Sequence, residues 1–440
     1  MKKLTVYFIL AITILTSCSK DLSPVETYTP VTESVAVSDL MDKLYICCWG
    51  SSSVEGYLGN YDKYVVDNGH NLTIPNTNNI KMSFPRMLAT LTKDDGYEVW
   101  NCGVGGEGMP TIMARMGVIN MYNDTEFVLP SDGSYVDIAS YENGTFLKSK
   151  FDDSIVTPNE SYDSEDSFEA HSILNPVIVS GVECTLDLYT LSDNVINNSG
   201  ANAFKNGVIR LKRNIIGGVN VNIPKGTEFI PYSTELFKSQ DIVHIYLIGA
   251  NGGWYSTTDF ADKIDEAIKY YGDKYLILGY HTPNIFDNYS DEQKAQFNID
   301  IPTADEFREF QRAEYGSHFL DLRYLISKCW FIDYAAKYDL TIKYVSENGA
   351  GVFNGYSYQA DDISVIPEEY RYLLEEMPTE WKENNLPSDI QCYNLEIPPT
   401  TLMADPSSQT SSGQHCNYHG YVIMGHYIYD KLISLGYLLN

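Results

Sequence analysis

The sequence predicts an α/β fold in which a parallel β-sheet is flanked by helices in three layers and is interrupted by an inserted all-β subdomain. Continuous apolar runs of strand length lie at 44–49 and 242–249, as in strands that are buried on both faces of a parallel sheet. Segments with helical spacing follow these runs. Residues 122–240 differ, because short alternating stretches rich in Val, Ile, Thr, Asn and Gly indicate a small all-β insert.

The first part of the α/β domain, residues 41–121, has the order strand, turn, helix, strand, turn, helix. A Gly-rich turn at 103–108 separates the second strand from a short helix with Pro110 near its start. The strands and helices of this part are expected at 44–49, 84–91, 97–101 and 110–116.

The second part, residues 241–440, resumes the α/β pattern after the insert. A helix with one apolar face is expected at its end, where Tyr421, Met424 and Ile428 recur at helical spacing. Residues 331–399 read as a long elaboration of this part. The insert strands are expected near 177–178, 208–211 and 219–223, and the later elements at 242–249, 262–271, 275–279, 304–315 and 318–322.

The N-terminus has the pattern of an exported protein. Lys2 and Lys3 precede an apolar run at 4–15 that is too short to span a bilayer. The run ends in Leu-Thr-Ser-Cys18, which resembles the bacterial lipobox, where the cysteine is acylated after cleavage. We therefore expect a signal peptide at 1–17, lipid on Cys18, a tether at 18–40, and attachment to a membrane of the bacterial cell envelope on its periplasmic or cell-surface face. The alternative is an ordinary signal peptide.

Charge and cysteine content exclude other classes. The formal net charge of −29 repels phosphate backbones, so nucleic-acid binding is not expected. Besides Cys18, an odd number of the eight cysteines remains, so at least one thiol is unpaired within the chain. Cys47 and Cys48 lie in an apolar run and are expected to be buried thiols. The sequence contains no CxxC spacing of the kind that binds a metal.

Four segments that could contribute catalytic groups adjoin the predicted strands or the last helix. Ser52 follows the first strand among small residues, and the turn containing Gly106 follows the second. Asn251 follows the strand at 242–249, and His415 opens the last helix. Because ligands bind at the carboxyl ends of parallel strands, these groups could face the same sheet edge, where a glycine N–H and the Asn251 amide could donate to a developing oxyanion.

In that order, the segments WGSSSVEG, NCGVGGE, IGAN and GQHCNYHGY resemble the four sequence blocks of the SGNH (GDSL-type) serine hydrolase superfamily. The resemblance implies an SGNH/flavodoxin-like three-layer fold, with Ser52 as nucleophile and His415 as general base. It implies an oxyanion hole made by the Ser52 N–H, the Gly106 N–H and the Asn251 side chain. The implied reaction passes through an acyl-enzyme and needs no metal or organic cofactor.

Three positions depart from the family pattern. Ser51 stands where the family usually has Asp, Gly252 replaces the Asp after the block-three Asn, and Ser412 replaces the triad Asp. Three alternatives follow for His415: a backbone carbonyl or Ser412 orients it, Asp405 reaches it from the preceding loop, or the protein is a weak or inactive hydrolase.

Other interpretations of the same residues remain open. His415 and His419 have metal-ligand spacing, but no Glu accompanies them as in metalloproteases, so no metal site is expected. Glu107 is either a substrate contact or second-shell residue, or a charge at a helix start. The leading function is an esterase that removes short acyl groups from a small ester or an acylated polysaccharide, with acetyl on carbohydrate as the first choice. The alternatives are a catalytically weak or inactive surface lipoprotein that binds glycans, and an acyltransferase.

Overall fold

The computed structural model describes residues 44–56, 83–158, 174–190, 207–237, 241–283, 294–295, 299–329, 396–398, 402–403, 415–416 and 418–438. The predicted signal peptide, Cys18 and the tether lie outside the described residues, as does most of the elaboration at 331–399. Within these ranges, no helix has the length and apolar character needed to cross a membrane.

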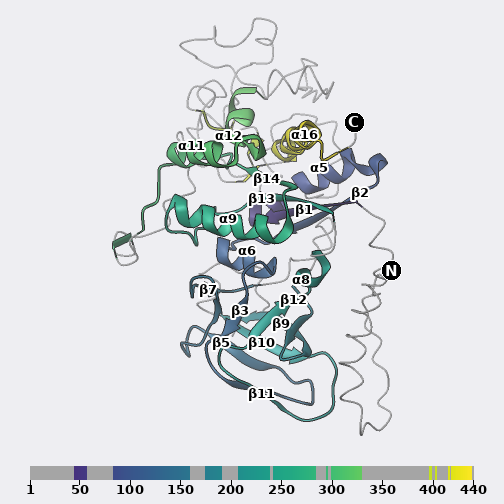
Figure 1. Ribbon diagram of the computed structural model, residues 1–440, viewed down its shortest axis with the longest axis vertical. Helices are drawn as coiled ribbons and strands as arrows, with labels where there is room; N and C mark the ends of the chain where they lie inside the picture. Colours follow the sequence, from purple (N-terminus) through teal and green to yellow (C-terminus); the bar gives the residue numbers. More distant parts are fainter. Residues whose placement is uncertain are drawn as a thin grey trace, which may run out of the picture.

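A five-stranded parallel sheet forms the centre of the α/β part (Figure 1). Its strand order is β15-β14-β13-β1-β2, so the chain adds β2 on one side of β1 and the later strands on the other. In open sheets of this kind, ligands bind at the carboxyl ends of the strands beside such a reversal. The strands are β1 (Leu44–Gly50), β2 (Tyr97–Gly103), β13 (Ile242–Leu247), β14 (Tyr275–Leu278) and β15 (Phe319–Leu320).

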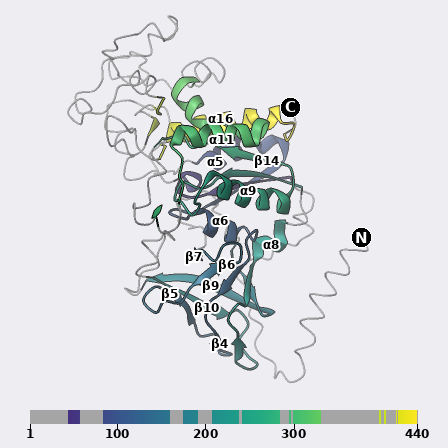
Figure 2. The ribbon, with the colours of Figure 1, turned by 60° about the vertical axis from the view of Figure 1, so that its left-hand side comes forward.

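Helices cover both faces of this sheet (Figures 1 and 2). Helices α5 (Phe84–Leu91) and α16 (Tyr418–Ser434) pack on one face, over Ile46 and Cys48 of β1. The opposite face carries Tyr45, Cys47 and Trp49. It is covered by α6 (Met109–Arg115), α8 (Tyr232–Phe237), α9 (Thr257–Tyr271) and α11 (Ala304–Tyr315). Both cysteines are buried free thiols, as predicted.

The insert is an eight-stranded antiparallel sheet with the order β5-β10-β9-β8-β12-β3-β6-β7, and it has its own core. A two-stranded sheet of β4 and β11 lies beside it, at the lower end of Figure 1. The strands are β3 (Met121–Asn123), β4 (Phe127–Leu129), β5 (Val136–Ser140), β6 (Leu147–Ser149), β7 (Ile155–Val156), β8 (Val177–Val179), β9 (Val182–Thr190), β10 (Gly207–Arg213), β11 (Val221–Ile223) and β12 (Glu228–Pro231).

A buried lysine fastens the insert to the α/β part. Lys263 of α9 is fully buried and lies 3.0 Å from Asp152 in the β6–β7 turn and 2.7 Å from Asp259 of its own helix. Burial acts to raise the pKa of Asp152, but hydrogen bonds from Ser154 and the Lys263 ammonium bring it below its usual value. The pair therefore stays ionised at neutral pH, and α9 and the insert are held together.

Element bounds differ from the sequence prediction where a polar side chain caps a helix. Helices α5 and α11 have the predicted limits, but α9 begins at Thr257 rather than Asp262, because the Ser256 side chain accepts the Asp259 N–H. The strand predicted at 318–322 is only β15. Asp321 instead caps the next turn, α12 (Leu322–Tyr324). The region predicted as all-β also contains α8, which returns the chain to the parallel sheet.

A neutral histidine lies in the core beneath α9. The Trp49 indole N–H donates to His244 Nδ1 at 3.0 Å, and the Tyr271 ring stacks on the imidazole with 4.3 Å between ring centroids. Burial lowers the pKa of His244 to about 3. In the unfolded chain this histidine is protonated below about pH 6.5, whereas in the folded chain it stays neutral down to about pH 3. The free energy of unfolding therefore has its full value above pH 6.5 and falls as the pH drops toward 3.

We expect the free energy of unfolding to be about 2 kcal/mol lower at pH 5 than at pH 8, because only the unfolded chain binds a proton at His244 in this range. Urea unfolding at both pH values should show this loss in the parent chain and a smaller loss in His244→Gln. The matched control is His318→Gln, which removes a partly exposed histidine. An equal loss in His244→Gln and in the parent would contradict the assignment.

Candidate active site

The ends of three strands lie at one level at the carboxyl edge of the parallel sheet. In the strand pairing, Gly50 of β1 lies opposite Gly103 of β2 on one side and Leu247 of β13 on the other. The loops that follow these strands therefore start side by side. They carry Ser52, the glycine turn and Asn251.

Ser52 is the first residue of the single helical turn α3 (Ser52–Glu55), directly after β1. The turn packs closely on the strand ends: a Cβ on Gly50 would lie 2.5 Å from the Leu247 carbonyl oxygen, and a Cβ on Gly103 would lie 2.1 Å from the Glu55 nitrogen. Both contacts are with backbone atoms, so only glycine fits at these two positions. This packing fixes α3 while leaving Ser52 partly exposed.

His415 reaches Ser52 from the other end of the chain. Ser52 Oγ and His415 Nε2 are 2.8 Å apart, which is hydrogen-bonding distance. The next residue, Cys416, is fully buried in the core under α16 and forms an isolated antiparallel bridge with Met403. The buried Cys416 thus fixes the backbone beside the imidazole. In the tautomer that carries its proton on Nδ1, the imidazole can accept a hydrogen bond from the Ser52 hydroxyl.

The glycine turn after β2 lies against Ser52. A Cβ on Gly105 would be 3.8 Å from Ser52 Cβ and 2.8 Å from a carboxylate oxygen of Glu55. Gly106 follows with φ +77°, a backbone conformation that favours glycine. The Ser52 N–H is at the first position of α3, where a helix offers no carbonyl acceptor of its own. Two of the three predicted oxyanion donors thus belong to adjoining segments.

Asn251, the third predicted donor, is tied to the same turn. Its side-chain amide donates to the Glu107 carbonyl oxygen at 3.1 Å, and the Met109 N–H donates to the Gly252 carbonyl oxygen at 3.0 Å. These two hydrogen bonds join the loop after β13 to the loop after β2. Asn251 is exposed, and its amide carries a second N–H.

Glu107 has a structural contact that the sequence did not indicate. Its carboxylate is fully buried two residues before the start of α6 and lies 2.8 Å from Arg115 Nη2. Sequence reasoning also did not predict Glu55 as a site residue, although it is three positions after Ser52 and hence on the same side of one helical turn.

Other predicted residues are not described. Ser412 and Asp405, the candidates for orienting His415, lie outside the described residues, as does the His419 side chain. Among the residues that the structure does describe, no three His, Cys, Asp or Glu side chains are grouped so as to hold a metal ion.

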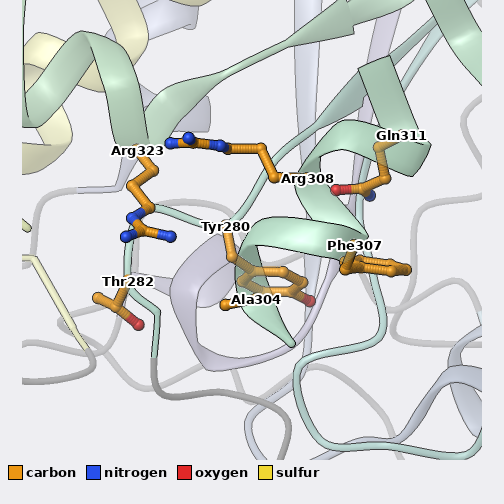
Figure 3. Close-up of a pocket in the computed structure, with 7 residues that line it drawn as sticks. All are labelled: Tyr280, Thr282, Ala304, Phe307, Arg308, Gln311 and Arg323. Carbon is orange, nitrogen blue, oxygen red and sulfur yellow. The ribbon is translucent and has the colours of Figure 1, made fainter. Parts of the chain in front are cut away.

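A small pocket opens farther along the same sheet edge (Figure 3). Tyr280 connects it to the candidate site, because its hydroxyl oxygen accepts the Ala250 N–H at 2.5 Å. The pocket is lined by Tyr280, Thr282, Ala304, Phe307, Arg308, Gln311 and Arg323.

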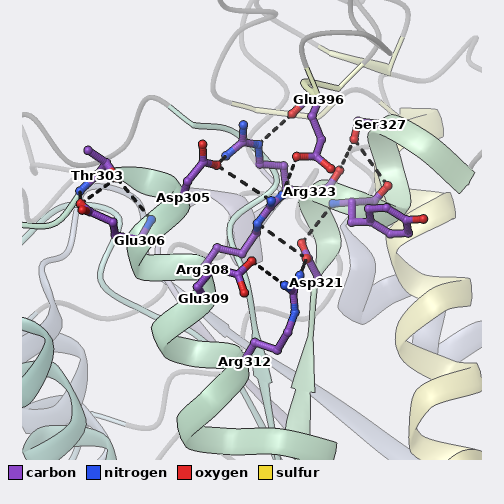
Figure 4. Close-up of polar contacts among 11 residues, drawn as sticks. Thr303, Asp305, Glu306, Arg308, Glu309, Arg312, Asp321, Arg323, Ser327 and Glu396 are labelled. Carbon is purple, nitrogen blue, oxygen red and sulfur yellow. Dashed lines mark hydrogen bonds and ion pairs between the residues drawn. The ribbon is translucent and has the colours of Figure 1, made fainter.

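Ion pairs secure the segment next to this pocket (Figure 4). Arg323 pairs with Asp305 of α11 at 2.6 Å and donates to the Glu396 carbonyl oxygen at 2.7 Å. Arg308 pairs with the Glu396 carboxylate at 2.9 Å. Single exposed pairs contribute little, but this network joins α11, α12 and the segment at Glu396.

We expect Gly103→Ala to lower the free energy of unfolding by about 1–3 kcal/mol, because the added methyl group would overlap the backbone of α3. Gly108→Ala is the matched control, since a Cβ there would lie 3.4 Å from its nearest neighbour, the Gly252 oxygen. Its cost should stay below about 1 kcal/mol. Chemical denaturation measures both, and equal costs would contradict the close packing of β2 on α3.

Comparisons of the chain with protein-family models, with curated proteins and with solved structures give no match. The functional assignment therefore depends on the geometry at the carboxyl edge of the sheet. The contact that distinguishes this edge is the one between Ser52 and His415.

Proposed function

We propose that the protein is a serine ester hydrolase of the SGNH type. The observation that carries the proposal is the 2.8 Å separation of Ser52 Oγ and His415 Nε2 at the carboxyl edge of a parallel sheet. A serine hydroxyl in contact with an imidazole nitrogen is the usual pairing of nucleophile and general base. The site combines them with backbone and amide N–H groups on adjoining loops.

In the proposed reaction, Ser52 Oγ attacks the ester carbonyl carbon while His415 Nε2 takes the hydroxyl proton. The tetrahedral intermediate collapses, the leaving oxygen receives that proton, and the alcohol departs from an acyl-Ser52 ester. His415 then takes a proton from water, which attacks the acyl group. The second tetrahedral intermediate collapses, His415 returns its proton to Ser52 Oγ, and the carboxylic acid is released.

The proposed oxyanion hole consists of the Ser52 N–H, the Gly106 N–H and the Asn251 side chain. Support comes from two contacts: Gly105 lies against Ser52, and Asn251 is hydrogen-bonded to the carbonyl of Glu107, the residue after Gly106. Donors fixed before the reaction stabilise the negative charge without reorganising, and this is where most of the rate enhancement would arise.

The strand order supports the SGNH assignment. Numbered along the chain, the five parallel strands have the order 2-1-3-4-5, as in flavodoxin-like sheets. The proposed site lies beside the first strand, where the order reverses. Ser412 stands at the position of the usual triad Asp, so the proposed pair of Ser52 and His415 has no acid at that position.

The proposed substrates are small acyl esters, with acetylated carbohydrates as the first class to test. This choice rests on the SGNH resemblance and on the proposed attachment of Cys18 to a membrane of the bacterial envelope. An acyltransferase would share the first half of the reaction and pass the acyl group to an alcohol instead of water.

We expect Ser52→Ala to reduce hydrolysis of 4-nitrophenyl acetate by the purified full chain to background. We expect His415→Ala to lower kcat about 10²–10⁴-fold, the usual contribution of a general base. Release of 4-nitrophenolate at pH 7.5 measures both. The matched control is Ser53→Ala, which removes the neighbouring buried hydroxyl and should leave the rate within about twofold of the parent.

Hydrolysis that persists in folded Ser52→Ala would overturn the proposal. A folded parent chain that hydrolyses no faster than Ser52→Ala would favour the alternative, a glycan-binding lipoprotein without catalysis. Binding of acetylated glycans by that inactive parent chain is then the next measurement.

A further inference from the structure

A buried ion pair lies directly behind the glycine turn. Arg115, at the end of α6, donates to one carboxylate oxygen of Glu107 from Nε at 3.0 Å and from Nη2 at 2.8 Å. The two side chains are 1% and 0% exposed, so both charges are removed from solvent. The guanidinium also lies 5.8 Å from the centre of the Trp49 ring.

The same guanidinium holds both ends of the turn. Arg115 Nη2 also donates to the Cys102 carbonyl oxygen at 2.8 Å, near the end of β2. Cys102 precedes the glycine-rich segment at 103–106 and Glu107 follows it, so one rigid planar group fixes the span across that segment. Three of its four residues are glycines without side-chain packing, so these contacts restrict a segment in which only Val104 is anchored by a buried side chain.

Glu107 also connects the Arg115 side chain to Asn251. Its carbonyl oxygen accepts the Asn251 side-chain N–H at 3.1 Å, while its carboxylate is held by Arg115. The position of the Asn251 amide therefore depends on the backbone of Glu107. One ion pair acts on both the Gly105–Gly106 segment and the Asn251 side chain, and neither of its charged groups reaches solvent.

The insert is attached to the same point. The Ser233 hydroxyl of α8 donates to the Arg115 carbonyl oxygen at 2.6 Å, and the Thr111 hydroxyl of α6 accepts the Thr157 N–H beside β7 at 3.1 Å. Helix α6 thus contacts the insert at two places, beside β7 and at α8.

The ion pair of Glu107 and Arg115 is not expected to add much to the stability of the fold. Burying two charges removes their hydration, and an apolar pair of similar volume is often as stabilising or more so. What an apolar pair lacks is directional bonding to the Cys102 carbonyl and to the carboxylate. The ion pair therefore differs from an apolar pair in fixing the positions of the groups that it bonds.

We propose that Glu107 and Arg115 are positioning residues that hold the glycine turn and Asn251 at the spacing an oxyanion requires. The inference rests on the proposed ester hydrolysis. Neither side chain contacts the substrate. Loss of the pair lowers kcat and leaves KM nearly unchanged, because the affected interactions form with the transition state and not with the bound ester.

The test compares Glu107→Gln with the parent full chain, using 4-nitrophenyl acetate as the probe. A displacement of about 1 Å in the donors costs about 10²-fold in rate, so we expect kcat to fall about 10–100-fold with KM within about twofold. Hydrogen exchange of the 103–108 segment, measured by mass spectrometry, is a second readout that needs no activity. It should become faster in Glu107→Gln.

Two further variants separate positioning from folding. Asp152→Asn disrupts the ion pair with the buried Lys263, away from the turn. It should lower the thermal midpoint and leave kcat unchanged. The double variant with Glu107→Met and Arg115→Met removes both charges at similar volume. Its thermal midpoint should exceed that of Glu107→Gln, while its kcat stays low.

The outcomes are distinguishable. If the parent chain shows Ser52-dependent hydrolysis and folded Glu107→Gln keeps kcat within twofold, the inference is overturned and the proposed function stands. If the parent chain shows no Ser52-dependent hydrolysis, the proposed function fails. Hydrogen exchange then decides whether the pair fixes the turn, and unchanged exchange at 103–108 in Glu107→Gln overturns the inference as well.

Discussion

The alignment of three parallel strand ends is the constraint on which the candidate site depends. Because Gly50 lies opposite both Gly103 and Leu247, the loops after β1, β2 and β13 begin at the same height and must share the same small space. Glycine at 50 and 103 lets the turn bearing Ser52 pack onto the strand ends. Given this alignment, a serine, a glycine turn and an asparagine at short distances after these strands meet at one edge of the sheet.

Buried contacts then fix the positions of the groups that meet at this edge. Cys416 is buried in the core and fixes the backbone of His415, which lies 2.8 Å from Ser52. The ion pair of Glu107 and Arg115 fixes the glycine turn, and through a backbone carbonyl it fixes Asn251. Reactive groups at the sheet edge remain accessible while the groups that hold them are buried, which is the arrangement expected of a preorganised site.

Much of this could be predicted from the sequence, because the strongest signals are local. The apolar run ending at Gly50 and the helical spacing at 84–91 and 304–315 gave nearly correct elements. Ser52 follows a parallel strand and His415 opens the last helix, so both could be expected at the same edge of the sheet, where they are 2.8 Å apart. The pair of Glu107 and Arg115 could not be predicted, because nothing local indicates that both charges are buried. The early start of α9 depends on a single capping hydroxyl, that of Ser256, which a search for apolar periodicity overlooks.

The central claim is that His415 activates Ser52 as a nucleophile, and covalent labelling tests it most directly. An alkyl fluorophosphonate loses fluoride when an activated serine oxygen attacks its phosphorus, which leaves a stable phosphonyl ester. Mass spectrometry of the treated full chain should find one adduct per molecule, on Ser52, and His415→Ala should remove it. An adduct on another residue, or a folded parent chain without an adduct, would contradict the account.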